Sequence, residues 1–213
     1  VGLVALLILL FPTPLISQEY DLIILNGRVI DGSGNPWYQA DIGVMGDRIM
    51  EIGDLSGKKA GHVIDARGLV VSPGFIDPHT HALRGIFDVP NAESALLQGV
   101  TTLTEGNDGS SPYPIDRHYA DIEDLRISPN WAVFVGQGTI RQRVIGFGLR
   151  KASPQEMDRM KQMVRDAMEQ GALGISTGLF YVPGSFTSIE EVIELSKVAA
   201  EYNGIYISHM REE

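Results

Sequence analysis

The chain has 213 residues, a net charge of −10 and no cysteine. Its 17 Lys and Arg residues form no cluster, which argues against a nucleic-acid partner, because binding phosphates needs grouped cations. The absence of cysteine excludes disulfides, thiolate metal ligands and a cysteine nucleophile. Apolar residues make up 44% of the chain, as expected for a globular protein with a sizeable core.

Residues 1–18 have the composition of a signal peptide. Residues 1–10 are almost wholly apolar, Pro12 and Pro14 interrupt the run, and no charged residue precedes Glu19. The apolar run is too short to span a bilayer fully, which favours a signal peptide. A short membrane anchor is the alternative interpretation. We expect an incomplete signal peptide over 1–18 and export to the periplasm or the cell exterior. No stable membrane insertion is expected after its removal.

Residues 19–72 are typical of short strands joined by tight turns. Asn26–Gly27 and Gly46–Asp47 separate apolar runs, and both pairs tolerate the positive φ angles that two-residue hairpins need. Further apolar runs at 63–65 and 69–71 continue the pattern. The segment predicts a small β domain with a hairpin at each of the two turns.

From residue 73 to 213 the pattern changes to alternating strands and helices. Five strand-like runs are expected, at 75–77, 100–104, 131–135, 173–176 and 205–208. Ser153, Pro154 and Glu156 form a capping box that starts one helix, and Ser188 starts another. Such alternation predicts parallel strands with right-handed crossovers, in either a (β/α) barrel or an open doubly wound sheet. Both architectures place their sites at the carboxyl ends of strands.

The first of these strands ends in His79–Thr80–His81. On an extended strand, residues two apart face the same side, so His79 and His81 point together. Two neutral imidazoles that converge at the carboxyl end of a strand are a natural pair of ligands for a divalent metal. His-x-His alone is weak evidence, but its position after a β domain and at the start of a βα series strengthens the metal interpretation.

Four runs resemble one family. The run VVSPGFIDPHTHA follows an NGRVIDGSG segment, and GVTTLTEGNDG, GALGISTGLFYVPGSF and YISHMREE come later. Together they resemble the amidohydrolase superfamily and, within it, the D-aminoacylase group, enzymes that remove acyl groups from N-acyl-D-amino acids. The resemblance implies a small N-terminal β-sandwich over 19–72. It also implies the first part, about five strands, of a metal-dependent (β/α)₈ TIM-like barrel over 73–213, with the rest of the barrel outside this sequence.

Asp108 departs from the pattern of the resembling group, which has Gly-Asn-Cys-Gly where this chain has Gly106–Asn107–Asp108–Gly109. Aspartate can bridge two metals, but its oxygen favours zinc over manganese or iron less than a thiolate does. The resemblance implies one or two divalent ions, Zn²⁺ first and Mn²⁺ or Fe²⁺ as alternatives, held by His79, His81 and Asp108. A turn residue is the alternative for Asp108, and Glu105 is a less favoured substitute ligand.

Further site residues follow from the resemblance. A tyrosine near the fifth strand helps to polarise the scissile carbonyl in that group, which implies a catalytic role for Tyr206. Arg211 is expected to bind the substrate carboxylate, and Ser176 and Tyr181, in and after the fourth strand, are expected to contact substrate. The alternatives are strand packing, a structural ion pair and turn formation. His209 is less favoured as a ligand.

The expected reaction is hydrolysis of the amide bond of a small N-acylated amino acid by metal-activated water. This 213-residue chain is expected to be inactive by itself, because the remaining ligands and the catalytic aspartate of the group lie beyond it. Two alternatives stay open. The protein could act on another amide, such as a cyclic amide or a β-aspartyl dipeptide, or it could be a secreted, non-catalytic binding protein with the same fold.

Overall fold

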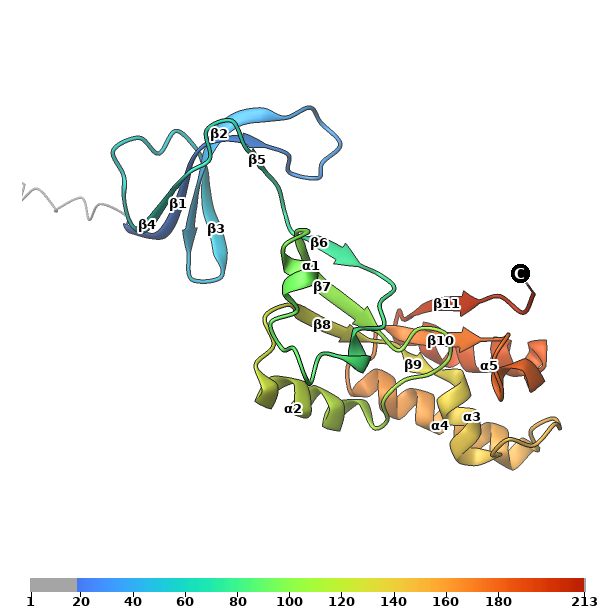
Figure 1. The fold of residues 1–213 in the computed structure, drawn as a ribbon. Coiled ribbons are helices and arrows are strands. Elements are labelled where there is room, and N and C mark those ends of the chain that lie inside the picture. The colour runs from blue at the N-terminus through green and yellow to red at the C-terminus, as the bar shows by residue number, and fades with distance from the viewer. Residues whose placement is uncertain (1–18, 213) are drawn as a thin grey trace, which may run out of the picture. The chain divides into compact units, whose positions relative to one another are not determined.

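The computed structural model describes residues 19–212, so the signal peptide expected over 1–18 lies outside the described residues. The chain divides into two compact units, with the division between Pro73 and Gly74 (Figure 1). Each unit has its own core, and each is described by itself below. Among the described residues, no helix is both long and apolar enough to cross a membrane.

The first unit is a single five-stranded sheet (Figure 1). Its order is β3-β2-β1-β4, with β5 also paired to β1. β2 is antiparallel to both β1 and β3, whereas β4 and β5 both run parallel to β1. The strands are β1 (Glu19–Val29), β2 (Tyr38–Met45), β3 (Arg48–Gly53), β4 (Lys59–Asp65) and β5 (Val70–Val71).

The two predicted hairpins of this unit have different outcomes. The hairpin at Gly46–Asp47 is confirmed, because Met45 pairs with Arg48 across it. The hairpin at Asn26–Gly27 is wrong. β1 continues through both residues, and its pairing with β2 shifts register there as a bulge. Asn26 has a φ of 60°, and its amide donates to Asp65 Oδ1 at 2.9 Å, so the turn residues absorb an irregularity instead of reversing the chain.

The sheet of the first unit leaves much apolar surface uncovered. Its small core gathers around Tyr20, Ile23 and Leu55, which are almost fully buried. Several large apolar side chains of the later strands remain exposed: Ile49, Met50, Ile52, Val63, Ile64, Leu69 and Val70. Ile49 and Met50 are neighbours on β3, and Val63 and Ile64 are neighbours on β4, so their side chains point to opposite faces of the sheet. Apolar surface is therefore exposed on both faces, and a second layer packed on the sheet would cover one of them.

The second unit alternates strands and helices, as the sequence predicts, and all its strand pairs are parallel (Figure 1). One sheet has the order β6-β7-β8 and the other β11-β10-β9. The strands are β6 (Phe75–Asp77), β7 (Val100–Glu105), β8 (Asn130–Val133), β9 (Val135–Gly136), β10 (Gly174–Gly178) and β11 (Ile205–His209). The run expected as one strand over 131–135 therefore breaks at Phe134, where the chain passes from one sheet to the other.

Helices connect and cover these strands. The α-helices are α1 (Glu93–Leu96), α2 (Ile115–Leu125), α3 (Gln137–Val144), α4 (Pro154–Glu169) and α5 (Ile189–Ala200), and the short 3₁₀ helices are η1 (Ala82–Arg84) and η2 (Gly184–Phe186). α4 begins as predicted: the Ser153 side chain accepts from Glu156 N, and the Glu156 carboxylate accepts from Ser153 N. The Ser188 cap that starts α5 is likewise confirmed.

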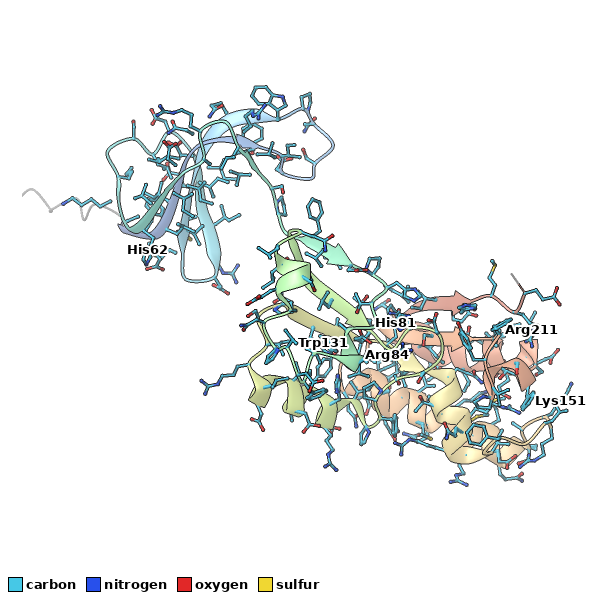
Figure 2. The ribbon with its side chains drawn as sticks, viewed as in Figure 1. His62, His81, Arg84, Trp131, Lys151 and Arg211 are labelled. Carbon is cyan, nitrogen blue, oxygen red and sulfur yellow. The ribbon has the colours of Figure 1, made fainter. Side chains whose placement is uncertain are left out.

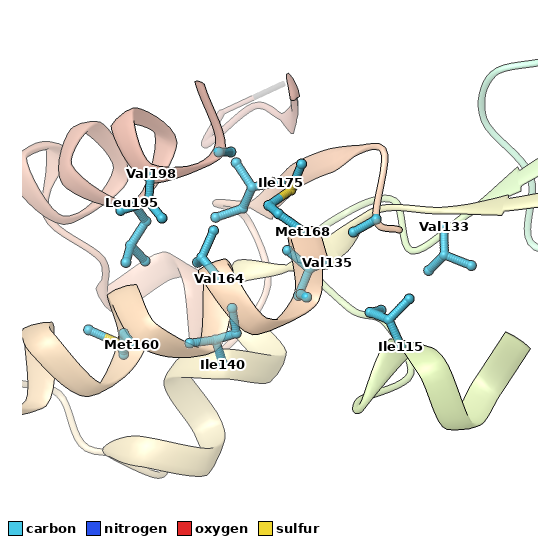
Figure 3. Close-up of a cluster of buried hydrophobic side chains, with 13 residues drawn as sticks. Ile115, Val133, Val135, Ile140, Met160, Val164, Met168, Ile175, Leu195 and Val198 are labelled. Atoms are coloured by element: carbon cyan, nitrogen blue, oxygen red, sulfur yellow. The ribbon is translucent and has the colours of Figure 1, made fainter. Parts of the chain in front are cut away.

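The main core lies between the second sheet and the inner faces of α4 and α5 (Figure 3). Met160 and Val164 on α4 meet Leu195 on α5 and Ile175 on β10, and all are almost fully buried. Burying each such side chain stabilises the fold by roughly 1.5–3 kcal/mol. The apolar stripe predicted on α4 is therefore a packing face, and it holds β10 and its carboxyl end in place.

Candidate metal centre

The carboxyl ends of β6 and β7 bring the predicted ligands together. The two strands are parallel, with Asp77 opposite Leu103, so the segments that follow them leave the same edge of the sheet. His79 and His81 follow β6, and Asp108 follows β7. Asp108 has a φ of 57°, in the left-handed region that aspartate tolerates better than most residues, and this turns its side chain back toward the histidines.

The three side chains form a compact donor set. Asp108 Oδ2 lies 3.3 Å from His79 Nε2 and 3.4 Å from His81 Nε2. One donor atom from each residue lies within 4.8 Å of the other two. Ligands bonded to zinc at about 2.0–2.1 Å in a tetrahedron are about 3.3–3.4 Å apart, so the nitrogen–oxygen distances already match a shared ion. The imidazoles are 52% and 54% exposed and the aspartate 14%, which leaves one side open.

The chemistry of this donor set fits a divalent cation. Asp108 Oδ1 is buried and has no hydrogen-bond partner in the described part of the chain. No Lys or Arg within residues 19–212 forms an ion pair with Asp108 or with the nearby buried Glu105. A buried carboxylate oxygen without a partner is costly, and a metal ion would provide the positive charge and the bond that this carboxylate lacks. Three protein ligands would leave a coordination position for water or substrate.

A cavity of about 440 Å³ opens beside these ligands. Its lining includes His81 and Asp108 on one side and Tyr181 and Val182 from the loop after β10 on the other. This volume lies in the range of about 300–1,000 Å³ typical of small-molecule sites. The carboxyl ends of both sheets therefore contribute to one pocket.

Arg84 lines the same cavity and was not singled out by the sequence analysis. It ends η1, three residues after His81, and both are labelled in Figure 2. Its guanidinium makes no ion pair or side-chain hydrogen bond with any other residue in the 19–212 range. A signal existed in the sequence, since loops at the carboxyl ends of strands carry site residues, but a lone arginine there has no distinctive pattern.

Tyr181 and His209 form a pair at the pocket wall. Tyr181 Oη lies 3.1 Å from His209 Nε2, and His209 Nδ1 lies 3.0 Å from the carbonyl oxygen of Met210. A carbonyl accepts only, so Nδ1 carries the proton and Nε2 accepts from the Tyr181 hydroxyl. The aromatic rings pack edge to face at 4.8 Å. Tyr181 therefore presents an oriented phenol next to the pocket that holds Asp108.

Tyr206 and Arg211 lie in hydrogen-bonded settings outside the lining of that pocket. Tyr206 Oη is 2.9 Å from Thr177 Oγ1 on the neighbouring strand β10. The Arg211 guanidinium donates to the carbonyl oxygens of Ser185 at 2.7 Å and Thr187 at 2.9 Å. Both carbonyls belong to the loop that follows Tyr181, so Arg211 clamps this loop.

Ser176 is fully buried and links two loops. Its hydroxyl donates to the carbonyl oxygen of Gly106 and accepts from Gly109 N. Next to it the backbones touch directly: a Cβ on Gly109 would lie 2.5 Å from Gly178 N, and a Cβ on Gly178 would collide with the carbonyl of Asp108. Gly109 also has a φ of 74°. The loop that carries Asp108 is therefore seated on β10 by main-chain contact.

His118 is a buried histidine in a charged stretch of the sequence. Asp116, Arg117 and Asp121 surround it along the chain, but it lies on the inner face of α2 and is 5% exposed. Its Nε2 accepts from Trp131 Nε1 at 3.0 Å. Burial lowers the pKa of His118, against the opposing charge of Asp121. The residue is thus a neutral packing histidine. Ile115, His118 and Ile122 are all buried, and their helical spacing is the sequence signal that could have identified this face.

Comparison with known proteins supports the same interpretation. The model of a family described as the amidohydrolase family matches residues 62–207. The chain belongs to the amidohydrolase family. It is 40% identical to the D-aminoacylase of Alcaligenes xylosoxydans xylosoxydans, over 92% of this chain and 46% of that protein. The chain thus spans about half the length of the curated relatives that it matches.

Two solved members of the family are similar in structure. One is the N-acyl-D-glutamate deacylase of Bordetella bronchiseptica, in complex with zinc and a phosphonate that mimics the tetrahedral intermediate of its reaction. It is 33% identical with a TM-score of 0.88, over 92% of this chain and 46% of that one. The other is a D-aminoacylase with a binuclear metal centre, 37% identical with a TM-score of 0.81, over 91% of this chain and 46% of that one.

Proposed function

We propose that the protein is a metal-dependent hydrolase that cleaves the amide bond of N-acyl-D-amino acids. The observation that carries the proposal is the donor set of His79, His81 and Asp108, whose spacing matches a shared ion and whose Asp108 Oδ1 is buried without a partner. The similarity to D-aminoacylase and to N-acyl-D-glutamate deacylase supports the choice of substrate.

The metal is proposed to be Zn²⁺, in one or two ions, with Mn²⁺ or Fe²⁺ as alternatives. Two imidazoles can bind all three metals. The oxygen donor of Asp108 weakens the preference for zinc over manganese or iron, compared with a thiolate. A bound divalent metal would polarise the amide carbonyl and make water nucleophilic at neutral pH. Zinc in the Bordetella bronchiseptica enzyme and a binuclear centre in a D-aminoacylase support this assignment.

The pocket offers groups for each part of an N-acyl amino acid. We propose that the substrate carboxylate binds next to Arg84, whose guanidinium is unpaired within the described chain. The Tyr181 hydroxyl has one proton, which it donates to His209 Nε2 in this structure. We propose that it redirects this hydrogen bond to the carbonyl oxygen of the substrate as negative charge develops there. Leu83, Val182 and Pro183 add apolar surface to the lining of the pocket, for the acyl group or side chain.

Tyr206, Arg211 and Ser176 are proposed to support the residues that contact the substrate. Arg211 would hold the loop after β10 in the position that puts Tyr181 in the pocket. Ser176 would hold the loop of Asp108 through its two hydrogen bonds. Tyr206 remains a candidate for direct catalysis if its hydroxyl exchanges Thr177 for substrate.

We further propose that residues 19–72 are part of a small β-sandwich and residues 73–213 the first part of a (β/α)₈ barrel. The exposed apolar side chains of the first unit would be covered by a second sheet. The two small parallel sheets of the second unit would continue round into a closed barrel. The 213-residue stretch alone is then expected to be inactive, because it would form only the first part of that barrel. Export directed by residues 1–18 stays a proposal, testable by N-terminal sequencing of the secreted protein.

The decisive experiment assays the protein, expressed in its full natural reading frame, against N-acetyl-D- and N-acetyl-L-amino acids with Zn²⁺ or Mn²⁺ added. We expect metal-dependent release of acetate from the D-series and little from the L-series, which serves as the matched control. Turnover of a cyclic amide or a β-aspartyl dipeptide instead would contradict the substrate assignment. Tight binding of the N-acyl compounds without any turnover would indicate a binding protein.

A further inference from the structure

Glu105 is a buried carboxylate next to the metal centre whose environment calls for an explanation. It is the last residue of β7 and is 3% exposed. Within residues 19–212 no lysine or arginine forms an ion pair with it. Burying a carboxylate without an ion pair is costly. The hydrogen bonds that Glu105 accepts therefore indicate which part of the structure it holds in place.

One oxygen of Glu105 holds both sides of His81. Glu105 Oε1 accepts from Thr80 Oγ1 at 2.6 Å and from Leu83 N at 3.1 Å. Thr80 is the residue between the two histidines, and Leu83 lies two residues after His81. The Thr80 hydroxyl has a single proton and two acceptors within reach, Glu105 Oε1 at 2.6 Å and the carbonyl oxygen of Thr104 at 2.9 Å. The shorter distance favours the Glu105 carboxylate as the acceptor.

The remaining polar groups of Thr80 are held by the same loop. Thr80 N donates to the carbonyl oxygen of Thr104 at 3.1 Å, and Asn107 Nδ2 donates to the carbonyl oxygen of Thr80 at 3.3 Å. The imidazoles of His79 and His81, by contrast, are about half exposed, so packing does little to orient them. Their direction is therefore set mainly by the backbone that Thr80 anchors.

We infer that Glu105 is a positioning residue for the metal centre, which acts through Thr80 to fix the segment that carries both histidine ligands. This inference rests on the proposed metal site. Hydrogen bonds behind metal ligands typically account for about 10–100-fold in metal affinity, because they hold the ligands in the geometry that the ion needs. Glu105 would therefore set how tightly the metal binds without touching it.

The test measures Zn²⁺ affinity of the full-length protein by competition with a chromophoric chelator, and the visible absorption of the Co²⁺-substituted protein. We expect Glu105→Ala to weaken Zn²⁺ binding by about 10–100-fold and to broaden the Co²⁺ bands. Glu105→Gln should retain most of the affinity, because its amide oxygen accepts the same two hydrogen bonds. This rescue separates positioning by hydrogen bonds from a need for the charge.

A second pair of variants carries the test if Glu105→Ala fails to fold. Thr80→Val removes only the hydroxyl and should weaken binding as Glu105→Ala does, whereas Thr80→Ser should not. Thr102→Val is the matched control, since this threonine lies on β7 and its hydroxyl accepts from Asn130, away from the ligands. The double variant Glu105→Ala/Thr80→Val should bind no more weakly than Glu105→Ala alone, because the two residues act as one unit.

Unchanged Zn²⁺ affinity in Glu105→Ala or in Thr80→Val would overturn the inference, as would Glu105→Gln as weak as Glu105→Ala. A parent protein that binds Zn²⁺ but does not hydrolyse N-acyl-D-amino acids would contradict the proposed function alone. The Zn²⁺ affinities of the variants would still decide the role of Glu105. A folded parent protein that binds no Zn²⁺ would overturn both.

Discussion

The carboxyl ends of the two small sheets in the second unit differ in how completely their polar groups are satisfied. After β7, the buried oxygens Asp108 Oδ1 and Asn107 Oδ1 have no partner within the described residues. At the carboxyl end of the second sheet, the Tyr181 hydroxyl, the Tyr206 hydroxyl and the Arg211 guanidinium all make hydrogen bonds to protein. Gln137 Oε1, after β9, is buried without a partner within the described residues, but Gln137 is not among the residues that line the pocket. Within residues 19–212, the unpaired buried oxygens of the pocket lining therefore belong to the first sheet.

This difference indicates where a ligand belongs. Buried polar atoms in folded proteins are nearly always paired, so unpaired ones in a well-packed region mark the place of an ion, water or substrate. Groups that are already paired are better suited to shape the pocket. The first sheet is then the metal-binding side of the pocket, and the second sheet supplies groups that shape the pocket and the Tyr181 hydroxyl. Mutagenesis can test this division.

The largest expected effect comes from removing a ligand at the first sheet. His81→Ala should weaken Zn²⁺ binding by more than about 100-fold, beyond the loss typical of residues behind the ligands, and should abolish turnover. His209→Ala, the matched histidine at the second sheet, should leave Zn²⁺ affinity unchanged. Equilibrium metal binding of the two variants checks this. Equal losses of affinity in both would erase the proposed division.

A smaller effect is expected within the second sheet, where two tyrosines compete for the role of carbonyl donor. Tyr181→Phe should lower kcat by about 10²–10³ with a smaller change in KM, the cost of losing an oxyanion donor. Tyr206→Phe should lose only the hydrogen bond to Thr177, worth about 0.5–1.5 kcal/mol of stability. Steady-state kinetics of both variants decides between them. A larger loss of kcat in Tyr206→Phe would restore the role first expected for Tyr206.

The smallest effect concerns the helix that supports the second sheet. The Arg150 guanidinium and the cap of α4 lower the pKa of Glu156 from 4.5 to about 2. A depressed pKa in the folded state stabilises the fold above about pH 4.5, and this contribution is lost as the pH falls toward 2. Glu156→Gln should therefore be less stable than the parent at pH 7, with a difference that shrinks between pH 4.5 and 2.

Urea unfolding of the parent and of Glu156→Gln across that range measures this difference. Glu194 also has a pKa of about 2 but is present in both proteins, so it cancels from the comparison. Ser153→Ala should cost about 0.5–2 kcal/mol and depend less on pH, because the cap is uncharged and, of the hydrogen bonds that lower the pKa of Glu156, that of the Ser153 side chain has the smallest effect. A pH-independent difference for Glu156→Gln would contradict the electrostatic account of this helix start.

Local signals in the sequence predicted local structure well. The capping box of Ser153 and Glu156, together with the apolar spacing behind it, predicted α4, because both depend only on residues within one helix. The alternation of strands and helices predicted the parallel pairing of the second unit. The grouping of His79, His81 and Asp108 agrees with the structure, because the strands that precede them are parallel and end at one edge. The reason given for the two histidines was wrong, since β6 ends at Asp77 and neither histidine lies on an extended strand.

Features that depend on distant partners could not be predicted in the same way. Asn26–Gly27 has the composition of a hairpin, but distant strands hold β1 on both sides of it. β4 pairs with β1 up to Leu25, β5 pairs with it from Arg28, and Gly27 itself pairs with Ala40 of β2. His118 is flanked by charges that masked the buried face of α2. Arg84 and Thr80 gain their significance only from residues after β7 and β10, and no spacing along the chain reveals such contacts.

The main-chain contact between Gly109 and Gly178 bears on how the pocket could diversify over evolution. Any side chain at either position would push the loop of Asp108 off β10, so this floor is closed to gradual change. Leu83 and Val182 also line this cavity, but they do so with side chains, which can be substituted one at a time. New acyl preferences should therefore arise, in natural lineages and in directed evolution alike, through substitutions in the wall while the floor stays fixed.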